Sequence, residues 1–245
     1  MSKIITSLAV LLVMFSCKEQ AAKKDITSEN KAIITHTNKE PIETISKVAL
    51  DEVQKLKSLD GLADTTFIRL ADYSNDFAYD MRYATTNNFL KAKVYDCAEC
   101  YTRVKTAKAL IKANNEFLKK GYKIKFFDCY RPNSVQYKMW AIVPNPQYVA
   151  NPVKGSIHNK GGAVDITLVD LKGNEVDMGT DFDFFGKKAY HDNTNLPKEI
   201  LANRVLLKET MEAYGFWSIR TEWWHYNLSA ASNEKIANFK WDCTD

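Results

Sequence analysis

The sequence predicts one α+β domain, with a central antiparallel sheet flanked by helices. Stretches with helical periodicity and stretches with strand alternation are mixed along the chain. No regular strand–helix repeat with glycine-rich turns is present in the sequence, which argues against a doubly wound parallel sheet. The segment 63–245 also has roughly the length that buries a single hydrophobic core.

The first predicted helix covers residues 102–120. Its apolar residues recur at helical spacing, and Gly121 follows it as a stop signal. A strand is expected next, over residues 123–130. Apolar and polar residues alternate in the first half of that segment, and Pro132 ends it.

The second half of the domain repeats this order of strand and helix. Residues 162–170 alternate between apolar and polar side chains, which indicates a strand. A long helix is expected over residues 197–214, because a proline stands in its first turn and Gly215 follows it. The aromatic-rich segment 216–228 is interpreted as a final strand with a break.

The composition is that of a soluble globular protein. Hydrophobic residues make up 45% of the chain and charged residues 26%, and 9 glycines and 6 prolines exclude a collagen-like or low-complexity chain. The formal net charge is +4, and the basic residues are scattered. Because a phosphate backbone is bound by a dense basic stripe, we expect no nucleic-acid partner.

The N-terminus has the pattern of an export signal. Lys3 precedes an apolar run over residues 4–15, and Ser16 and Cys17 follow it. The run is too short to span a hydrocarbon core of about 30 Å at 1.5 Å per residue. Because a small residue before a cysteine is similar to a bacterial lipoprotein signal, residues 1–16 are expected to be removed and Cys17 lipidated. The alternative is ordinary secretion, with Cys17 in a tail.

The next segment, 17–62, is polar and weakly periodic, and we interpret it as a tether that leads to the folded domain 63–245. These features predict an exported protein in the cell envelope that faces the periplasm or the cell exterior. The membrane would be contacted only through the N-terminal lipid.

Two stretches of the sequence hold the candidate metal ligands and the candidate general base. His158 and Asp165 lie in a loop and strand with two glycines between them, and the other stretch ends in Glu222, two tryptophans and His225. Two imidazoles and a carboxylate are ligands that a catalytic zinc site takes, with one position left for water. Glu222 would be the general base. Since residues 222 and 225 face opposite ways in an ideal strand, a bulge or turn is predicted at residues 223–224.

Each of these residues also has an ordinary structural interpretation. Asp165 could cap a loop, His158 could be a surface residue, and His225 could be a satisfied histidine beside core tryptophans. No His-Glu-x-x-His motif is present in the sequence. His191 follows a loop and is expected to be structural.

Four stretches of the domain, taken together and in order, resemble the VanX-type D-alanyl-D-alanine dipeptidases. They are residues 83–89, 127–132, 156–165 and 222–225, and the resemblance extends over about residues 67–228. Those enzymes are zinc D,D-peptidases that share a fold with the hedgehog signalling domain. The resemblance therefore implies a hedgehog/D,D-peptidase-like fold and a metallopeptidase that binds one Zn²⁺ per chain.

The resemblance also implies a role for each residue of the site. His158, Asp165 and His225 would bind zinc, and Glu222 would activate the water. Arg131 would stabilise the oxyanion of the tetrahedral intermediate, which suits a permanently charged, forked donor.

Three further residues would contact the substrate. Ser156 would contact the dipeptide near the metal, Asp183 would pair with its free ammonium group, and Tyr83 would line the same end. A carboxylate at that end restricts an enzyme to dipeptides. The alternative for Asp183 is a solvated turn aspartate.

The predicted function is hydrolysis of the D-alanyl-D-alanine dipeptide in cell-wall peptide turnover, with residues 63–245 as the catalytic domain. One alternative is a zinc D,D-carboxypeptidase that acts on longer peptidoglycan peptides, which does not require Asp183. Another is a non-catalytic envelope lipoprotein that only binds its ligand. The presence of Glu222 and Arg131 together with all three ligands argues against the binding protein.

The remaining cysteines form an even set, Cys97, Cys100, Cys129 and Cys243. In an oxidising compartment they can pair in three ways. We expect one disulfide that joins Cys243 to Cys97 or Cys100, and we expect Cys129 to be a free buried thiol.

Overall fold

The computed structural model describes residues 55–243. The predicted signal segment 1–16, the lipidation site Cys17 and most of the predicted tether 17–62 lie outside the described residues. Of the tether, residues 55–62 are described, and Lys57 forms an ion pair of 2.6 Å with Asp72 of the domain. None of the helices in residues 55–243 has the length and apolar character needed to cross a membrane.

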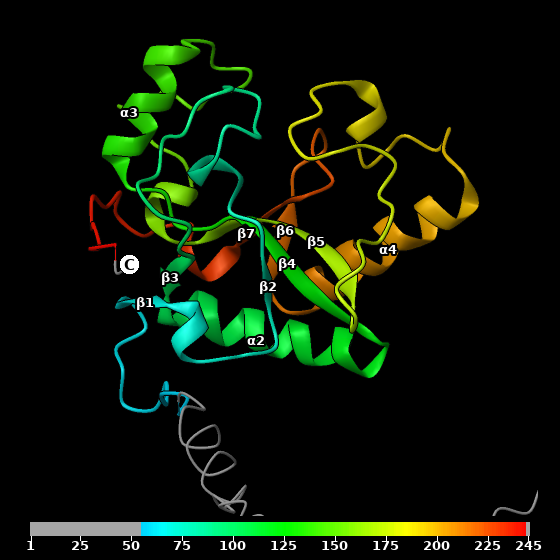
Figure 1. The fold of residues 1–245 in the computed structure, drawn as a ribbon, viewed down its shortest axis with the longest axis horizontal. Helices are drawn as coiled ribbons and strands as arrows, with labels where there is room; N and C mark the ends of the chain where they lie inside the picture. Colours follow the sequence, from blue (N-terminus) through cyan, green and yellow to red (C-terminus); the bar gives the residue numbers. More distant parts are fainter. Residues whose placement is uncertain (1–54, 244–245) are drawn as a thin grey trace, which may run out of the picture. The chain divides into compact units, whose positions relative to one another are not determined.

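The described chain folds as α+β, as predicted, and its central sheet has five strands in the order β2-β4-β5-β7-β6 (Figure 1). The pairs β4–β5, β5–β7 and β7–β6 are antiparallel, whereas β2 is parallel to β4 at one edge. A separate antiparallel pair joins β1 to β3. The strands are β1 (Phe67–Arg69), β2 (Ala78–Tyr79), β3 (Tyr101–Arg103), β4 (Tyr122–Asp128), β5 (Ala163–Asp170), β6 (Phe216–Ser218) and β7 (His225–Leu228).

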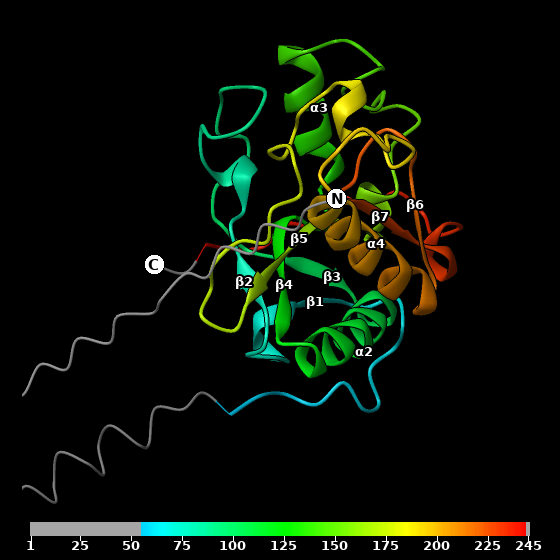
Figure 2. The ribbon, with the colours of Figure 1, turned by 90° about the vertical axis from the view of Figure 1, so that its right-hand side faces the viewer.

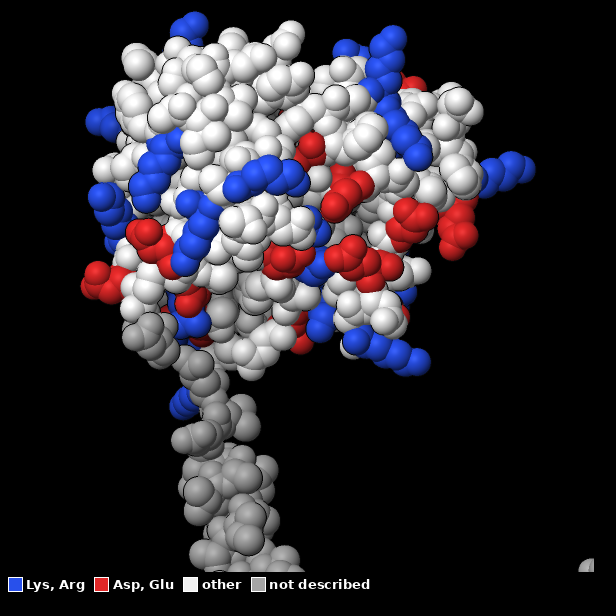
Figure 3. Space-filling model, turned by 45° about the horizontal axis from the view of Figure 1, so that its top comes forward, with Lys and Arg blue, Asp and Glu red and all other residues white. Residues whose placement is uncertain are grey.

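Within residues 55–243, three α-helices accompany the sheet: α2 (Val104–Lys119), α3 (Asn133–Ile142) and α4 (Lys198–Ala213). Helix α2 contacts β4 and α4, and α4 contacts β6. Figures 1 and 2 show α3 at the opposite end of the domain from α2. On the face drawn in Figure 3, acidic and basic side chains are interspersed.

The core forms where the alternating strands meet the apolar stripe of α2. Leu110 and Phe117 of the helix and Ile124, Phe126 and Leu168 of the strands are completely buried. Burying large apolar side chains of this kind contributes about 1.5–3 kcal/mol each. The predicted helices at 102–120 and 197–214 and the predicted strands at 123–130 and 162–170 are all present, with ends that differ by one or two residues.

The predicted break in the last strand is also present, because residues 219–224 leave the sheet between β6 and β7. The chain also turns sharply between His158 and the strand that carries Asp165. This turn depends on Gly161, which has φ +72° and ends the short helical turn His158–Lys160. A Cβ at this position would lie 2.6 Å from the ring of Phe67. Only glycine fits such a left-handed, crowded position without strain.

Two disulfides cross-link the described domain. Cys97 pairs with Cys243, which is one of the two pairings predicted for Cys243. Cys129 pairs with Cys100, so the expectation of a free buried thiol was wrong. The backbone N–H of Tyr130 donates to the carbonyl of Tyr101 at 2.9 Å, and this long-range contact places the two preceding cysteines side by side.

The last described residues, 233–243, form a C-terminal strap over the strand pair β1–β3. Phe239 stacks on Phe67 at 5.2 Å, and Trp241 stacks on Tyr101 at 4.6 Å. The backbone of Ala237 also donates to the carbonyl of Asn159 at 2.9 Å. The Cys97–Cys243 disulfide closes the end of this strap.

Candidate metal centre and active site

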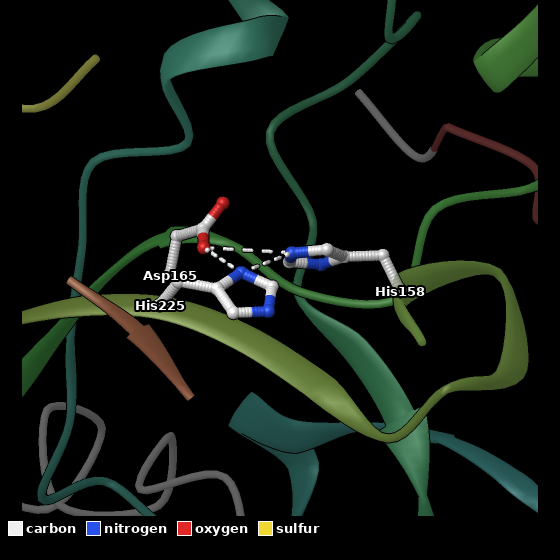
Figure 4. A group of neighbouring side chains, drawn as sticks. All are labelled: His158, Asp165 and His225. Carbon is white, nitrogen blue, oxygen red and sulfur yellow. Dashed lines mark hydrogen bonds and ion pairs between the residues drawn. The ribbon is translucent and has the colours of Figure 1, made fainter. Parts of the chain in front are cut away.

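Three of the predicted ligands meet at one point of the sheet (Figure 4). Asp165 of β5 and His225 of β7 are directly paired across the two strands, so their side chains emerge on the same face. His158 reaches the same point from the helical turn before Gly161. The Nδ1 of His225 lies 2.9 Å from Oδ1 of Asp165, and the Nε2 of His158 lies 3.4 Å from that oxygen and 3.3 Å from His225 Nδ1.

The second nitrogen of each imidazole ring is held by a hydrogen bond. His158 Nδ1 lies 2.7 Å from the carbonyl oxygen of Cys129, and His225 Nε2 lies 3.0 Å from Oδ1 of Asn227. A ring nitrogen that donates to such an oxygen leaves the other nitrogen of a neutral imidazole free to bind a metal. Both free nitrogens face Asp165.

This cluster fits a zinc ion. Bonds of about 2.0–2.2 Å to a tetrahedral zinc place the ligand atoms about 3.3–3.6 Å apart. Two of the observed separations, 3.3 and 3.4 Å, lie in this range, and the third, 2.9 Å between His225 and Asp165, is shorter. His158 and Asp165 are 3% and 4% exposed, so water does not compete for them. No other group of three His, Cys, Asp or Glu side chains with this geometry is found within residues 55–243.

The charges of the cluster depend on one another. Burial opposes ionisation of Asp165, yet the two histidines hold the pKa of this carboxyl below its usual value. Burial likewise opposes protonation of His225, yet the adjacent carboxylate of Asp165 raises the pKa of the imidazole. The carboxylate is therefore charged at neutral pH and available to a cation.

Glu222 lies at the same cavity, on the irregular segment between β6 and β7. The chain bends at Trp223 and Trp224, as predicted, and both indoles are buried. This bend turns Glu222 to the side of the cavity that His225 also lines. Burial raises the pKa of Glu222, which suits a group that accepts and releases a proton near neutral pH.

Arg131 also lines the cavity, and two neighbouring side chains fix the position of its guanidinium group. Its Nε and Nη2 donate to Oδ2 of Asp128 at 3.1 and 2.6 Å, and its Nη1 donates to Oε1 of Gln136 at 2.9 Å. A guanidinium group has five N–H donors. These three bonds therefore leave one N–H on each terminal nitrogen for another acceptor.

The three predicted substrate-binding residues line this cavity, which has a volume of about 270 Å³. Tyr83 Oη donates to the two oxygens of Asp183 at 3.0 and 3.2 Å, and the backbone N–H of Phe89 donates to Oδ2 at 3.3 Å. Burial, followed by the charge of Asp165, raises the pKa of Asp183 to about 8. Ser156 Oγ lies 3.2 Å from Oδ1 of Asn159.

Several residues that support the site were missed by sequence reasoning. Asp128 is completely buried, and it accepts hydrogen bonds from Tyr95 Oη at 2.8 Å and from the Cys129 backbone at 2.9 Å as well as from Arg131. Its position at the end of an apolar strand, three residues before Arg131, is the one signal that could have found it. The roles of Gln136 and Asn227 depend on contacts that no local pattern shows.

Comparison with known proteins shows which family the domain resembles. A family model described as D-ala-D-ala dipeptidase, Peptidase M15, matches residues 63–242. The D-alanyl-D-alanine dipeptidase of Escherichia coli strain K12 is 32% identical over 183 residues, which cover 74% of this chain and 95% of the relative. The protein of the same name from Enterococcus faecalis strain V583 is 30% identical, with 66% of this chain and 91% of the relative covered.

Among solved structures, the chain is similar to a mutant of the vancomycin resistance D,D-pentapeptidase VanY in complex with Zn(II). The TM-score is 0.36 at 16% identity, over 53% of this chain and 73% of that chain. A likeness this weak adds nothing to the argument from the site.

Proposed function

Because the chain belongs to the D-ala-D-ala dipeptidase family of M15 peptidases, we propose that it hydrolyses the D-alanyl-D-alanine dipeptide with Glu222 as general base. The family makes it a zinc-dependent peptidase. One observation carries the finer proposal: a single cavity brings together the metal ligands, Glu222, Arg131 and Asp183. A volume of about 270 Å³ suits a ligand smaller than those of ordinary drug-sized pockets.

His158, Asp165 and His225 hold the metal. When bound, zinc polarises the scissile carbonyl and lowers the pKa of water. The hydrogen bonds that Cys129 and Asn227 accept from the two imidazoles fix both rings, so the donor atoms need no rearrangement before binding.

Glu222 moves the proton of the reaction. Its carboxylate accepts a proton from the attacking water and delivers it to the nitrogen of the leaving amine. Burial raises the pKa of this carboxyl above its usual value, which brings its basicity closer to that of a group poised for both steps. Glu222 is not part of the ligand cluster, so its replacement is expected to leave zinc bound.

Arg131 stabilises the negative charge on the former carbonyl oxygen. Two of its N–H donors remain after the bonds to Asp128 and Gln136, and a donor that is fixed beforehand needs no reorganisation when the charge develops. The ion pair with Asp128 keeps the guanidinium group charged inside the protein.

Asp183 and Tyr83 recognise the free N-terminus of the dipeptide. Burial raises the pKa of Asp183 to about 8 in the free protein, and the ammonium group of a bound dipeptide would lower it, because a nearby opposite charge favours the carboxylate that pairs with it. The hydrogen bond from Tyr83 fixes the orientation of this carboxyl group. Ser156 lies in the same cavity and offers a hydroxyl group to the substrate. A D,D-carboxypeptidase that acts on longer peptides has no use for a carboxylate that pairs with a free amine, so this contact favours the dipeptidase.

The test compares D-Ala-D-Ala, L-Ala-L-Ala and N-acetyl-D-Ala-D-Ala as substrates of the zinc-loaded protein. We expect hydrolysis of the first and little of the other two. Equal rates for the free and acetylated D,D-dipeptides would contradict the role of Asp183. Glu222→Gln is expected to lower kcat by about 10²–10⁴-fold with zinc retained, whereas Glu209→Gln on the exposed face of α4 is a matched control.

We further propose that the protein acts in the cell envelope, in cell-wall peptide turnover, and that lipidation of Cys17 anchors it. The two disulfides of the described domain support an oxidising compartment. A Cys17→Ser variant is expected to leave the membrane fraction for the soluble envelope fraction. Recovery of the wild-type protein in the cytoplasm would contradict this proposal.

A further inference from the structure

Helix α4 contains an arginine that is buried without an acidic partner. Arg204 is 5% exposed, and Arg82, Arg103 and Arg131 are buried to a similar extent. Each of those three forms an ion pair with a carboxylate, whereas Arg204 forms none with any of the described residues. Because a buried charge requires compensating interactions, the groups that contact Arg204 indicate what this side chain does.

The guanidinium group of Arg204 binds backbone carbonyls of two different loops. Its Nε donates to the carbonyl of Met178 at 2.7 Å, and its Nη1 donates to the carbonyl of Tyr190 at 3.3 Å. The group also lies over the indole of Trp223, 6.0 Å from the ring centroid. Arg204 therefore contacts two loops and the bend that directly follows Glu222.

The first of these loops holds the C-terminal side of the segment that carries Glu222, residues 219–224 between β6 and β7. Two residues after Met178, the hydroxyl of Thr180 accepts a hydrogen bond of 2.7 Å from the indole N–H of Trp223. Arg204 is thus connected to the residue after Glu222 both directly, through the indole ring, and through the loop that Met178 begins.

The second loop holds the N-terminal side of the same segment. Tyr190, whose carbonyl accepts a hydrogen bond from Arg204, is followed by His191. The backbone N–H of His191 donates to the carbonyl of Arg220 at 2.9 Å, two residues before Glu222. On each side of Glu222, a hydrogen bond therefore comes from a loop that Arg204 binds.

We propose that Arg204 is a positioning residue that fixes the Glu222 carboxylate in the catalytic cavity by holding these two loops and the indole of Trp223. This inference rests on the proposed function of Glu222. Arg204 does not line the cavity itself, so it acts through the segment that carries the general base. A displacement of about 1 Å can cost a reacting group about 10²-fold in rate.

The role requires the forked shape of arginine, and it spares the metal ligands. A guanidinium group can bind two carbonyls and an aromatic face at the same time, whereas the ammonium group of lysine is a single point charge. His158, Asp165 and His225 are reached by none of the three contacts described for Arg204. Loss of Arg204 is therefore expected to displace the general base and to leave the zinc ligands in place.

Arg204→Lys and Arg204→Met test this role in the zinc-loaded protein. Lysine keeps the charge but offers one nitrogen for two carbonyls, and methionine keeps only an apolar stem. We expect both variants to lower kcat for D-Ala-D-Ala about 10–100-fold, with zinc affinity within about threefold of the wild type. Retention of kcat in both variants would overturn the proposal. So would a loss of zinc affinity as large as the loss of kcat, because Arg204 would then support the domain as a whole.

The Michaelis constant separates a displaced base from a distorted substrate site. The carboxyl group of Asp183 keeps its hydrogen bonds from Tyr83 and Phe89, which Arg204 does not contact. We therefore expect KM for D-Ala-D-Ala to change less than about threefold in both Arg204 variants. An effect confined to KM, with kcat unchanged, would contradict the positioning of Glu222.

Lys208→Met is the matched control. It removes a cation one turn further along α4, whose ion pair of 3.8 Å with Glu212 lies at the surface. Surface ion pairs contribute little, so kcat is expected to stay within about twofold of the wild type.

Hydrogen exchange of the peptide that contains residues 219–224, followed by mass spectrometry on the zinc-loaded protein, gives a readout that does not depend on activity. We expect faster exchange in Arg204→Lys and Arg204→Met than in Lys208→Met. Equal exchange in all three variants would overturn the proposal. If Glu222→Gln retained full activity while exchange still followed the predicted order, the proposed function of Glu222 would fail and the hold of Arg204 on this segment would stand.

Discussion

Arg131 and Glu222 line the same cavity, yet the segments that carry them are anchored by different kinds of interaction. The cross-linked wall consists of residues 128–131 and the turn that carries His158. Cys100 binds this wall covalently at Cys129. The C-terminal strap supports it from outside, since Ala237 donates to Asn159, and Asn159 Nδ2 donates to the carbonyl of Arg131 at 2.8 Å.

The hydrogen-bonded wall consists of residues 180–183 and residues 219–224, which connect β6 to β7 and carry Glu222. Neither of the two disulfides of the described domain reaches it. Hydrogen bonds hold it. Trp223 donates to Thr180, Tyr83 and the Phe89 backbone donate to Asp183, and the backbone N–H of His191 donates to the carbonyl of Arg220.

The difference in how the two walls are anchored parallels a difference in the chemical groups that they carry. In the proposed mechanism, the cross-linked wall carries groups that keep one charge state, the guanidinium of Arg131 and the imidazole of His158. The hydrogen-bonded wall carries Glu222 and Asp183, whose pKa values are both raised by burial. The proposed general base and the carboxyl group proposed to bind the substrate's N-terminus thus lie on the part of the site that only non-covalent contacts restrain.

The largest effect on stability is expected from the outer disulfide. Cys97 and Cys243 are 146 residues apart, and a closed loop of that length restricts the unfolded chain by about 5 kcal/mol in the chain-entropy description. Urea unfolding of the Cys97→Ser, Cys243→Ser double variant should show a loss approaching this value. Because the strap lies outside the cavity, zinc affinity and kcat at 25 °C should change less than threefold. A loss of kcat much greater than threefold in this variant would show that the strap is part of the catalytic apparatus.

Removal of the inner disulfide is expected to affect both stability and metal binding. The Cys100→Ala, Cys129→Ala double variant loses a cross-link between residues 29 positions apart, which lowers the free energy of unfolding by about 3–4 kcal/mol. The Cys129 carbonyl also orients His158, and loss of such support weakens zinc binding by about 10–100-fold. Competition with a chelator measures this, with the outer-disulfide variant as control. Unchanged zinc affinity would contradict the role of the inner disulfide in orienting His158 through the Cys129 carbonyl.

A smaller loss is expected in the hydrogen-bonded wall. Thr180→Val removes the acceptor of the buried Trp223 indole N–H, and an unsatisfied buried donor costs about 1–3 kcal/mol. Thr180→Ser keeps the hydroxyl and should be nearly neutral. Thermal unfolding of both variants measures the difference. If serine and valine were equally destabilising, the methyl group of Thr180 rather than its hydroxyl would be the stabilising element.

The last effect is gradual, a pH dependence of stability that arises from Asp183. Its pKa is raised from 3.8 to about 8, so between these values the folded chain holds a proton that the unfolded chain has released. The contribution of this group is complete below about pH 4 and is lost as the pH rises towards 8, by at most about 1.4 kcal/mol per pH unit.

Urea unfolding of the chelator-treated protein at several pH values tests this prediction. Asp183→Asn should flatten the profile between pH 5 and 8 by at most about 1.4 kcal/mol per unit, whereas Asp181→Asn at the exposed neighbouring position should not. A stability that rises with pH in the wild type relative to Asp183→Asn would have the wrong sign for a buried carboxyl group.

Local patterns in the sequence predicted helices α2 and α4, strands β4 and β5 and the broken strand β6–β7, but they did not predict helix α3 or the short strands β1, β2 and β3. The helix at 104–119 and the strand at 163–170 follow from side-chain periodicity, which the sequence shows within a few residues. The break at Trp223 and Trp224 was predicted for a similar reason, because Glu222 and His225 can share a cavity only if the strand bends between them.

The sequence by itself also determined the types of residue at the site, including His158, Asp165, His225 and Glu222. Tertiary structure decided what holds them. The pairing of Cys129 with Cys100 and the anchoring of Arg131 by Asp128 and Gln136 appear only once the strands are in register. Periodicity records which face of an element is buried, whereas a contact between distant residues depends on how the elements pack, and the sequence carries no local signal for that packing.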